Sequence, residues 1–317
     1  MTMMTGLSLG YLVFEVSNPD RWSRFSTTIL GLMPAEAGCG GEMLAFRCDD
    51  AAYRLLLRQG GRDDLAALGW SAATPAAFEA VLERLQGMQV AIEEQPVLAA
   101  KRNVVRMITF RDPDGTLNEV VEGLPEASTP FASAAMPGGF NAGMLGIGHA
   151  VLASHDPARL EVFYAAALGM GVTERLRTKV GPIPVQGSFL HANSRHHSLA
   201  VMSVPSRKRL NHFMLEARRL ADVGVAYDRA RQAGVPIMLE IGQHPEPDST
   251  CSFYGETPSG FDFEIGAGTQ VIVPEGWETH RQTIASRWGH HPTLRAKLRA
   301  LSAMLLRPFN DPLKQAA

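Results

Sequence analysis

The ten histidines of this 317-residue chain are distributed unevenly, and they give the first indication of chemistry. None precedes residue 149, so all of them lie in the second half of the sequence. Surface histidines should scatter along a chain, whereas imidazole is a common metal ligand and the usual acid–base group near neutral pH. We therefore expect metal or acid–base chemistry in the second half alone. The histidines are His149, His155, His191, His196, His197, His212, His244, His280, His290 and His291.

Two of these histidines and one glutamate could form a metal site. His149, His212 and Glu264 fall in three separate predicted strands. Two imidazoles and one carboxylate would make the facial ligand set of non-haem Fe(II) oxygenases, which leaves positions open for a substrate and dioxygen. Asp262 is a competing ligand, because side chains alternate along a strand and Asp262 shares a face with Glu264. The ligand types suit Fe(II) or Mn(II), and the absence of cysteine ligands argues against a structural zinc site.

An internal repeat indicates which elements position these residues. The segment GYLVFEVSNPDRWSRFSTTILGL (residues 10–32) aligns without gaps to GHAVLASHDPARLEVFYAAALGM (residues 148–170). Each copy reads as an apolar strand, then Asn-Pro or Asp-Pro at a helix start, then a glycine near the helix end. The turns DPDGTLNE (residues 112–119) and TPSGFDFE (residues 257–264) match in the same way, and each leads into a strand that carries a glutamate.

The repeat predicts two homologous domains, at residues 1–125 and 143–270, joined by a Pro/Gly/Ser/Ala-rich linker at 126–142. Within each domain the order strand, helix and several strands occurs twice, which favours an α+β fold whose sheet curves, barrel-like, around a cavity. In the tail, residues 271–317, leucines recur at helical spacing. We expect an amphipathic helix there, packed on the domain or on a neighbouring subunit, with a basic membrane-surface helix as the alternative.

The first copy keeps the predicted fold but lacks the imidazoles. Its glutamate has a counterpart in the second copy, whereas a tyrosine and an alanine stand where the second copy has histidines. Only the second domain is therefore expected to bind a metal. The corresponding pairs are Tyr11 and His149, Ala67 and His212, and Glu119 and Glu264.

Composition excludes several other classes of protein. The balance of 30 basic and 32 acidic residues argues against a protein that coats nucleic acid or a membrane surface. Three cysteines cannot form a disulfide framework, and no segment has the character of a signal peptide or a membrane-spanning helix. We expect a cytoplasmic enzyme.

Three segments together resemble a known family: GIGHAVLAS (146–154), RHHSLAVMSVPSRKRLNHFMLEA (195–217) and SFYGETPSGFDFEIG (252–266). They resemble the type I extradiol catechol dioxygenases of the vicinal oxygen chelate superfamily, and most of all the 2,3-dihydroxybiphenyl 1,2-dioxygenases. The resemblance implies four βαβββ modules, two per domain, with Fe(II) only in the C-terminal barrel. It also implies extradiol cleavage of a catechol with insertion of both atoms of O2.

The resemblance assigns roles to individual residues. His197 matches the family's acid–base histidine, while periodicity alone cannot choose between it and His196; His196 is then expected to face solvent. Asp248 matches a pocket-loop acid, in a loop that is proline-rich and longer than the family pattern. The remaining matches are His149, His212 and Glu264 as iron ligands, His244 and Tyr254 as groups beside the substrate oxygens, and Val151, Val180, Phe189 and Val204 as lining of the aromatic pocket.

The apolar pocket positions favour a substituted or bicyclic catechol, such as 2,3-dihydroxybiphenyl, over catechol itself. We expect Fe(II) rather than Mn(II) as the cofactor, O2 as the co-substrate, and a homo-oligomer without a nucleic-acid or membrane partner. One alternative is another metal-dependent enzyme of the superfamily, either a glyoxalase-like isomerase or a Mn(II)-dependent ring-cleaving enzyme. Another is a metal-free ligand-binding module, which would not need the three ligand residues together.

Overall fold

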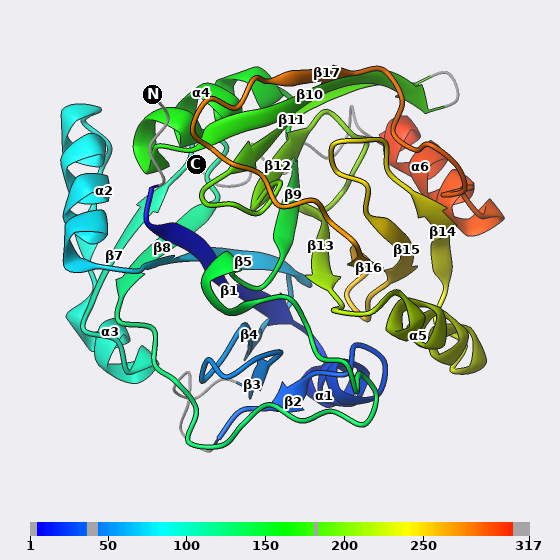
Figure 1. Cartoon of the computed structure of the whole chain (residues 1–317), viewed down its shortest axis with the longest axis horizontal. Helices are drawn as coiled ribbons and strands as arrows, with labels where there is room; N and C mark the ends of the chain where they lie inside the picture. The colour runs from blue at the N-terminus through cyan, green and yellow to red at the C-terminus, as the bar shows by residue number, and fades with distance from the viewer. Residues whose placement is uncertain (1–4, 37–43, 181–182, 307–317) are drawn as a thin grey trace.

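The computed structural model describes residues 5–36, 44–180 and 183–306. Two mixed β-sheets lie side by side, one from each half of the chain, with helices on their outer faces (Figure 1). Within the described residues, none of the helices is both long enough and apolar enough to cross a membrane.

The first sheet has the strand order β2-β3-β4-β1-β5-β8-β7-β6. Its strands are β1 (Leu7–Val16), β2 (Met33–Pro34), β3 (Leu44–Arg47), β4 (Leu55–Gln59), β5 (Asp64–Ala72), β6 (Glu93–Glu94), β7 (Arg106–Arg111) and β8 (Leu117–Glu122). The helices of this half are α1 (Pro19–Thr28), α2 (Pro75–Gly87) and α3 (Pro96–Arg102).

The second sheet has the order β14-β15-β16-β13-β9-β12-β11-β10-β17. Its strands are β9 (His149–Ala153), β10 (Gly171–Val180), β11 (Ile183–His191), β12 (Leu199–Met202), β13 (Leu210–Glu216), β14 (Ile237–Gln243), β15 (Cys251–Glu256), β16 (Asp262–Ala267) and β17 (His280–Gln282). The helices are the short 3-10 helix η1 (Gly143–Leu145), α4 (Pro157–Leu168), α5 (Leu220–Gln232) and α6 (Leu294–Leu306).

The two sheets have the same topology, so the predicted α+β fold of paired βαβββ modules is confirmed. Read from β6 to β2, the first order matches the second from β14 to β10, and β17 adds a further edge strand. The central pairs also agree in direction: β1 and β5 are antiparallel, as are β9 and β13. Each sheet curves, but its outermost strands do not pair within the described residues, so neither closes into a complete barrel (Figure 1).

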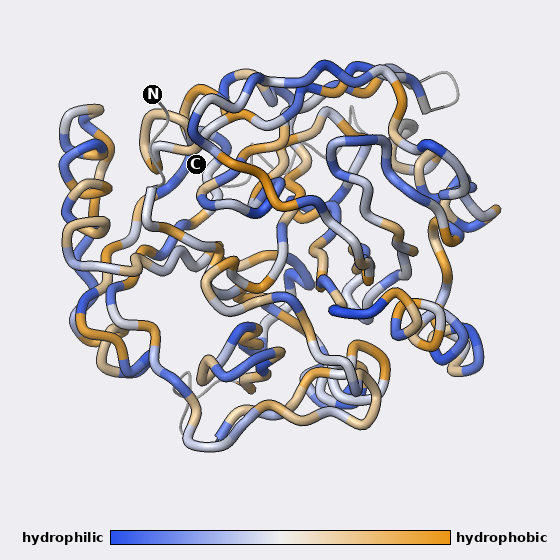
Figure 2. The backbone as a smooth tube through the Cα atoms, viewed as in Figure 1, coloured by the Kyte–Doolittle hydropathy of each residue, from blue (hydrophilic) through white to orange (hydrophobic). Residues whose placement is uncertain are grey.

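The helices that follow β1 and β9 begin as the sequence predicts. The Asn18 side chain accepts a hydrogen bond from the backbone N–H of Arg21, and the Asp156 side chain accepts one from Arg159. A side-chain acceptor at this position satisfies a backbone donor that has no partner inside the helix. Figure 2 shows hydrophilic and hydrophobic residues alternating along α2 and α5, as expected for helices with one buried face.

The predicted C-terminal helix exists, but its leucines do not pack on the domain, and their packing on a neighbouring subunit stays a prediction. Leu294, Leu298 and Leu301 are 72%, 57% and 52% exposed, so this face does not pack on the domain. Instead, Arg299 of α6 pairs with Asp262 at the start of β16, and the mostly exposed Arg295 pairs with Glu256 at the end of β15. These pairs join the basic side chains of the helix to acidic residues that are remote in sequence. The side chain of Leu305 lies outside the described residues.

Candidate metal centre and substrate cavity

The three expected ligands lie on three neighbouring strands. His149 opens β9, and its backbone pairs with Met214 of β13, which in turn pairs with Glu264 of β16. Gly148 allows this approach, because it has φ +146° and an added Cβ would lie 1.9 Å from the Met214 carbonyl oxygen. His212, also on β13, lies beside Val151 of β9. The central strands therefore bring the three side chains to one place.

The ligand atoms form a compact triangle. The Nε2 atoms of His149 and His212 are 3.4 Å apart, and Glu264 Oε2 lies 3.2 Å from the first and 3.4 Å from the second. A triangle of this size can hold an ion about 2 Å from each atom, the usual metal–ligand distance for imidazole and carboxylate. We call these three residues the metal-competent cluster, because their ligand atoms lie within 4.8 Å of one another and could hold one ion.

Glu264 provides a test of whether a cation fits. Its Oε2 atom is buried and accepts no well-directed hydrogen bond from the described residues. Burial alone would raise the pKa of Glu264, but contacts with His149, His212 and His244 lower it well below its usual range. Burial lowers the pKa of His149, which favours the neutral, ligating imidazole. An ionised, incompletely satisfied carboxylate beside two imidazoles fits a divalent cation.

A hydrogen bond to Asn211 orients His212. Its Nδ1 lies 2.8 Å from the Oδ1 atom of Asn211, a carbonyl oxygen that can only accept, so Nδ1 carries the proton. The lone pair of His212 is then on Nε2, the atom that faces Glu264. Such partners commonly fix the tautomer of metal-binding histidines.

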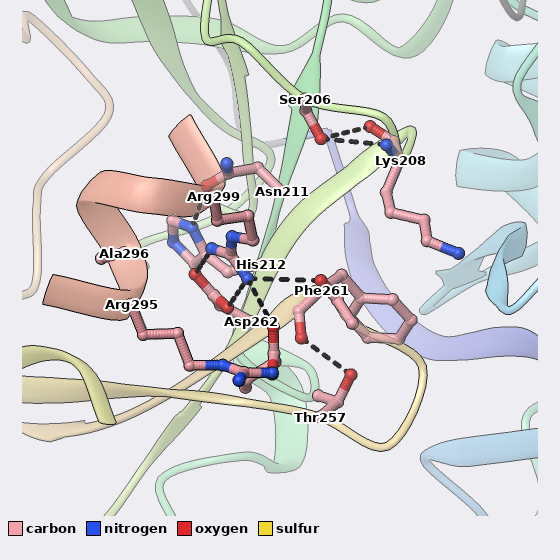
Figure 3. A network of polar contacts seen from close by, with 12 residues as sticks. Ser206, Lys208, Asn211, His212, Thr257, Phe261, Asp262, Arg295, Ala296 and Arg299 are labelled. Carbon is pink, nitrogen blue, oxygen red and sulfur yellow. Dashed lines mark hydrogen bonds and ion pairs between the residues drawn. The ribbon is translucent and has the colours of Figure 1, made fainter. Parts of the chain in front are cut away.

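Asp262 does not compete for the site. Arg299 of α6 donates from Nη1 to its Oδ1 at 2.6 Å and from Nη2 to its Oδ2, so both oxygens are occupied. Figure 3 shows Arg299 directed at Asp262, with His212 and Asn211 beside them. The metal-competent cluster contains Glu264 and not Asp262, so the geometry favours Glu264 as the carboxylate ligand.

A cavity of about 320 Å³ opens from the three ligand residues. Val151, Phe189 and Val204 line it, as predicted. The side chain of Val180 lies outside the described residues, and Thr178 of the same strand lines the cavity. Further lining comes from Leu176, Val185, Met202, Met238, Ile284, Pro292 and Ala296.

Three predicted polar residues surround the ligand cluster. The ring of His197 stacks 4.0 Å from that of His149 and lines the cavity. On the other side, the Nε2 atom of His244 lies 2.9 Å from the Tyr254 hydroxyl and 3.5 Å from Glu264 Oε1. The structure therefore brings these side chains around the same small volume as the ligand atoms.

Burial and nearby charges set the protonation of His244 and Tyr254. Burial opposes protonation of His244, but Glu264 and Asp248 outweigh it and raise its pKa to about 9. Its Nδ1 is 2.8 Å from the Ala285 carbonyl oxygen, so this nitrogen donates. Burial, with Glu264, raises the pKa of Tyr254 well above 10, so the phenol stays protonated and can donate a hydrogen bond.

His196 differs from expectation. It is fully buried and not solvent-facing, and its Nδ1 atom lies 2.9 Å from Nδ1 of His197. Both histidines precede β12, so strand alternation does not apply to them. Asp248, the predicted loop acid, is also buried and accepts a hydrogen bond from Thr250, and it forms a second close group with the two histidines.

The sequence reasoning missed several cavity residues. Glu174 and Gln282 line the cavity from β10 and β17, and Ala296 lines it from α6. His290, to which the sequence assigns no role, also lines the cavity, and its ring lies 4.6 Å from that of His244. Strand alternation marks Glu174 as sharing a face with Leu176 and Thr178, but no sequence pattern brings β17 or α6 to this cavity.

The equivalent place in the first sheet holds a different network. The Tyr11 hydroxyl donates to Glu119 at 2.6 Å, and Arg102 Nη2 lies 3.0 Å from both carboxylate oxygens. All three side chains are buried. A guanidinium therefore balances the charge of Glu119 where the second sheet has its metal-competent cluster.

Comparisons with known proteins match both halves of the chain. Residues 146–265 match the family model described as the Glyoxalase/Bleomycin resistance protein/Dioxygenase superfamily. Residues 9–60 match the model described as Dihydroxybiphenyl dioxygenase BphC D1. The two matches cover the ligand-bearing sheet and the start of the first sheet.

Full-length relatives are similar across most of the chain. The biphenyl-2,3-diol 1,2-dioxygenase of Paraburkholderia xenovorans (strain LB400) is 38% identical, over 89% of this chain and 94% of the relative. A protein of Rhodococcus jostii (strain RHA1) named as an iron-dependent extradiol dioxygenase is 32% identical, over 89% of this chain and 96% of the relative. A solved structure of a catechol 2,3-dioxygenase superposes with a TM-score of 0.83 at 30% identity, over 93% of this chain and 96% of that one.

Proposed function

The chain belongs to the extradiol dioxygenases of the glyoxalase/bleomycin resistance protein/dioxygenase superfamily, and from this premise we propose that its substrate is a substituted or two-ring catechol such as 2,3-dihydroxybiphenyl. The expectation of an extradiol ring-cleaving enzyme is confirmed, and the alternative of a metal-free binding module is set aside. The bond cleaved would lie beside the diol, between a hydroxylated ring carbon and its neighbour.

One observation carries the proposal: the buried Glu264 Oε2 atom, with two imidazole nitrogens 3.2 and 3.4 Å away, lies at an apolar cavity. We assign His149, His212 and Glu264 as ligands of Fe(II), the metal named for the Rhodococcus relative. Bound there, Fe(II) would acidify the diol and connect the electrons of the ring to dioxygen.

The protein's own groups would orient and deprotonate the diol. His244 and Tyr254 lie beside Glu264, where they can donate hydrogen bonds to substrate oxygens. His197, across the ligand cluster, would take the proton of a diol hydroxyl and later return one to the departing oxygen. General acid–base catalysis of this kind is within the ordinary capacity of imidazole.

The apolar lining supports a hydrophobic ring on the substrate. Val151, Phe189 and Val204 offer no hydrogen bonds, so affinity for the distal part of the substrate would come from burial of apolar surface.

The test is anaerobic reconstitution of the purified protein with Fe(II), or with Mn(II) in a parallel sample. 2,3-Dihydroxybiphenyl and air-saturated buffer are then added, and oxygen uptake and the yellow ring-opened product are followed. We expect one O2 consumed per product with Fe(II). No colour across a panel of 3-substituted and two-ring catechols, with metal bound, would exclude the proposed substrates, and activity with Mn(II) alone would reassign the metal.

Catechol and dioxygen are the small-molecule partners of an enzyme of this family. We propose in addition that the enzyme acts in the cytoplasm as a homo-oligomer. Sedimentation of the metal-loaded protein would test the second point, and a monomer at assay concentration would contradict it.

A further inference from the structure

A buried chain of side chains leads away from His197 on the side opposite the ligand cluster. His197 Nδ1 lies 2.9 Å from Nδ1 of His196, whose Nε2 lies 3.7 Å from Oε2 of Glu174. His196 is fully buried and Glu174 is only 3% exposed. Neither residue belongs to the metal-competent triad of His149, His212 and Glu264, and His196 forms a second close group with His197 and Asp248.

The His196 ring has one nitrogen without a hydrogen bond. Its Nε2 atom is buried and has no hydrogen-bond partner among the described residues. An unsatisfied buried polar atom destabilises the folded state, so it is rarely retained without a role. The ionisable oxygen that faces it, on Glu174, is slightly beyond hydrogen-bond distance, and a small side-chain rotation would close the gap.

The two imidazoles can hold their shared proton in two ways. When Glu174 is ionised, His196 donates to it from Nε2 and accepts at Nδ1 from His197, which leaves the free lone pair of His197 on Nε2. When Glu174 is protonated, it donates to His196, which donates from Nδ1 to His197, and His197 then carries its proton on Nε2. Each neutral imidazole has one donor and one acceptor nitrogen, so the state of Glu174 fixes both rings.

The surroundings of Glu174 are compatible with both the ionised and the protonated carboxyl group. Burial raises its pKa to about 7, although Gln282 donates a hydrogen bond to Oε1 at 3.0 Å. Asp248 raises this pKa further, while His244 lowers it. His280 pairs with the Glu174 backbone from β17 but its side chain is exposed.

His196 is unsuited to store the proton itself. Burial lowers its pKa to about 4, so its charged form is disfavoured near neutral pH. A proton that arrives from His197 would therefore move on to the carboxylate and would not remain on the ring.

We propose that Glu174 and His196 are positioning residues that act through His197 as a proton relay, an inference that rests on the proposed function. When a diol hydroxyl gives its proton to His197 Nε2, His197 gives its Nδ1 proton to His196, and His196 gives its Nε2 proton to Glu174. The substrate gains one negative charge and the carboxylate loses one, with both imidazoles neutral. The reverse sequence returns the proton to the departing oxygen.

The test compares Glu174→Gln with wild type. Glutamine keeps the size and can still accept from Gln282, but it cannot exchange a proton. We expect kcat to fall about 10- to 100-fold, the usual range for a residue that acts through another. Iron content, anaerobic affinity for 2,3-dihydroxybiphenyl and KM should not change. Glu174→Asp should recover part of kcat, and His196→Gln should lose as much as Glu174→Gln.

A second measurement does not depend on turnover. In the diamagnetic Zn(II)-substituted protein, 15N chemical shifts of His197 should report a change of tautomer as pH passes through the titration of Glu174. In Glu174→Gln only one tautomer should remain at every pH. Glu161→Gln, which removes a carboxylate that pairs with Arg175 at the outer surface of the same strand, should behave as wild type.

The outcomes separate the relay from the proposed function. If wild type fails to cleave any catechol, the proposed function fails, whereas an active wild type with an equally active Glu174→Gln overturns only the relay. Loss of iron or of anaerobic substrate binding in Glu174→Gln would also overturn it, because that pattern is expected from a structural role. A His197 tautomer that ignores Glu174 would do the same.

Discussion

Tyr11 and His149 occupy equivalent places in the two sheets. Tyr11 pairs with Gly69 on β5, and His149 pairs with Met214 on the corresponding strand, β13. Each side chain reaches the glutamate of the next strand, at 2.6 Å for the Tyr11 hydroxyl and 3.2 Å for His149 Nε2. The same backbone therefore holds a structural hydrogen bond in one sheet and a metal-competent pair in the other.

Arg102 should stabilise the buried pair of Tyr11 and Glu119 in the first sheet. Arg102→Met would leave Glu119 buried without its cation, and removal of one partner of a buried ion pair costs about 3–5 kcal/mol. We expect urea denaturation to show a loss near the lower end of that range, because Tyr11 still donates to Glu119. Arg102→Met combined with Glu119→Gln should recover much of the stability. An equal loss in the single and double variants would contradict this account.

Much of the fold and of the ligand set could be predicted because the chain contains two homologous halves, which can be compared with each other. The two copies share their strand order, so the difference between Tyr11 and His149 on matching strands indicates a different function and not a different fold. The role of α6 could not be predicted. Its leucine spacing is that of a buried face, but the acidic partners of Arg299 are brought to it only by the fold.

His196 was mispredicted for a local reason. Strand alternation would separate it from His197, yet both residues precede β12, and the chain there is not extended in a ladder. The relay partner Glu174 comes from β10, more than twenty residues earlier, so its approach depends on how the sheet curves. Sequence periodicity carries no information about such a contact.

Metal should stabilise the wild-type protein and Asp262→Asn, but not His212→Ala. A ligand that binds only the folded state adds about 4 kcal/mol at a thousand times its Kd. Anaerobic thermal unfolding with and without Fe(II), together with iron content after gel filtration, measures this. Asp262→Asn is the matched control, because Asp262 pairs in register with His212 but binds Arg299. Retained iron in His212→Ala would remove it from the ligand set.

His197→Ala should retain iron and bind the catechol anaerobically while its turnover falls roughly 10²–10⁴-fold, the effect typical of a general acid–base group. The reason is geometric: the ring stacks on His149 without belonging to the triad of ligand atoms. Single-turnover mixing with O2 would place the loss in the chemical steps. Turnover equal to wild type would exclude His197 from the mechanism.

Ala296 should limit the size of the substrate. It lines the cavity from α6, so Ala296→Leu adds three carbon atoms to the lining. We expect kcat/KM for 2,3-dihydroxybiphenyl to fall about tenfold or more, and that for 3-methylcatechol to fall less, since a hydrophobic pocket discriminates by about 1–3 kcal/mol per methylene. Leu298→Ala is the control, because Leu298 lies on the same helix but is 57% exposed. Equal losses for both substrates would show that Ala296 does not select for size.

Glu174 should make the protein less stable as pH rises. Its folded pKa of about 7 lies above the ordinary value of 4.5, so the folded state holds the proton more tightly than the unfolded state does. The penalty is absent below the ordinary value, grows as pH rises through this window and is complete above pH 7, where it amounts to roughly 3 kcal/mol at 1.36 kcal/mol per unit. The free energy of unfolding of Glu174→Gln, measured in urea, should therefore rise relative to that of wild type as pH rises through this window.

Glu161→Gln should show the opposite sign. Burial opposes ionisation of Glu161, but Arg175 and Ser188 lower its pKa. The stabilising effect of this carboxylate is therefore present near neutral pH and lost as pH falls. A Glu174→Gln difference that stays constant from pH 4.5 to 8 would show that this carboxyl titrates normally and cannot serve as the store of the relay.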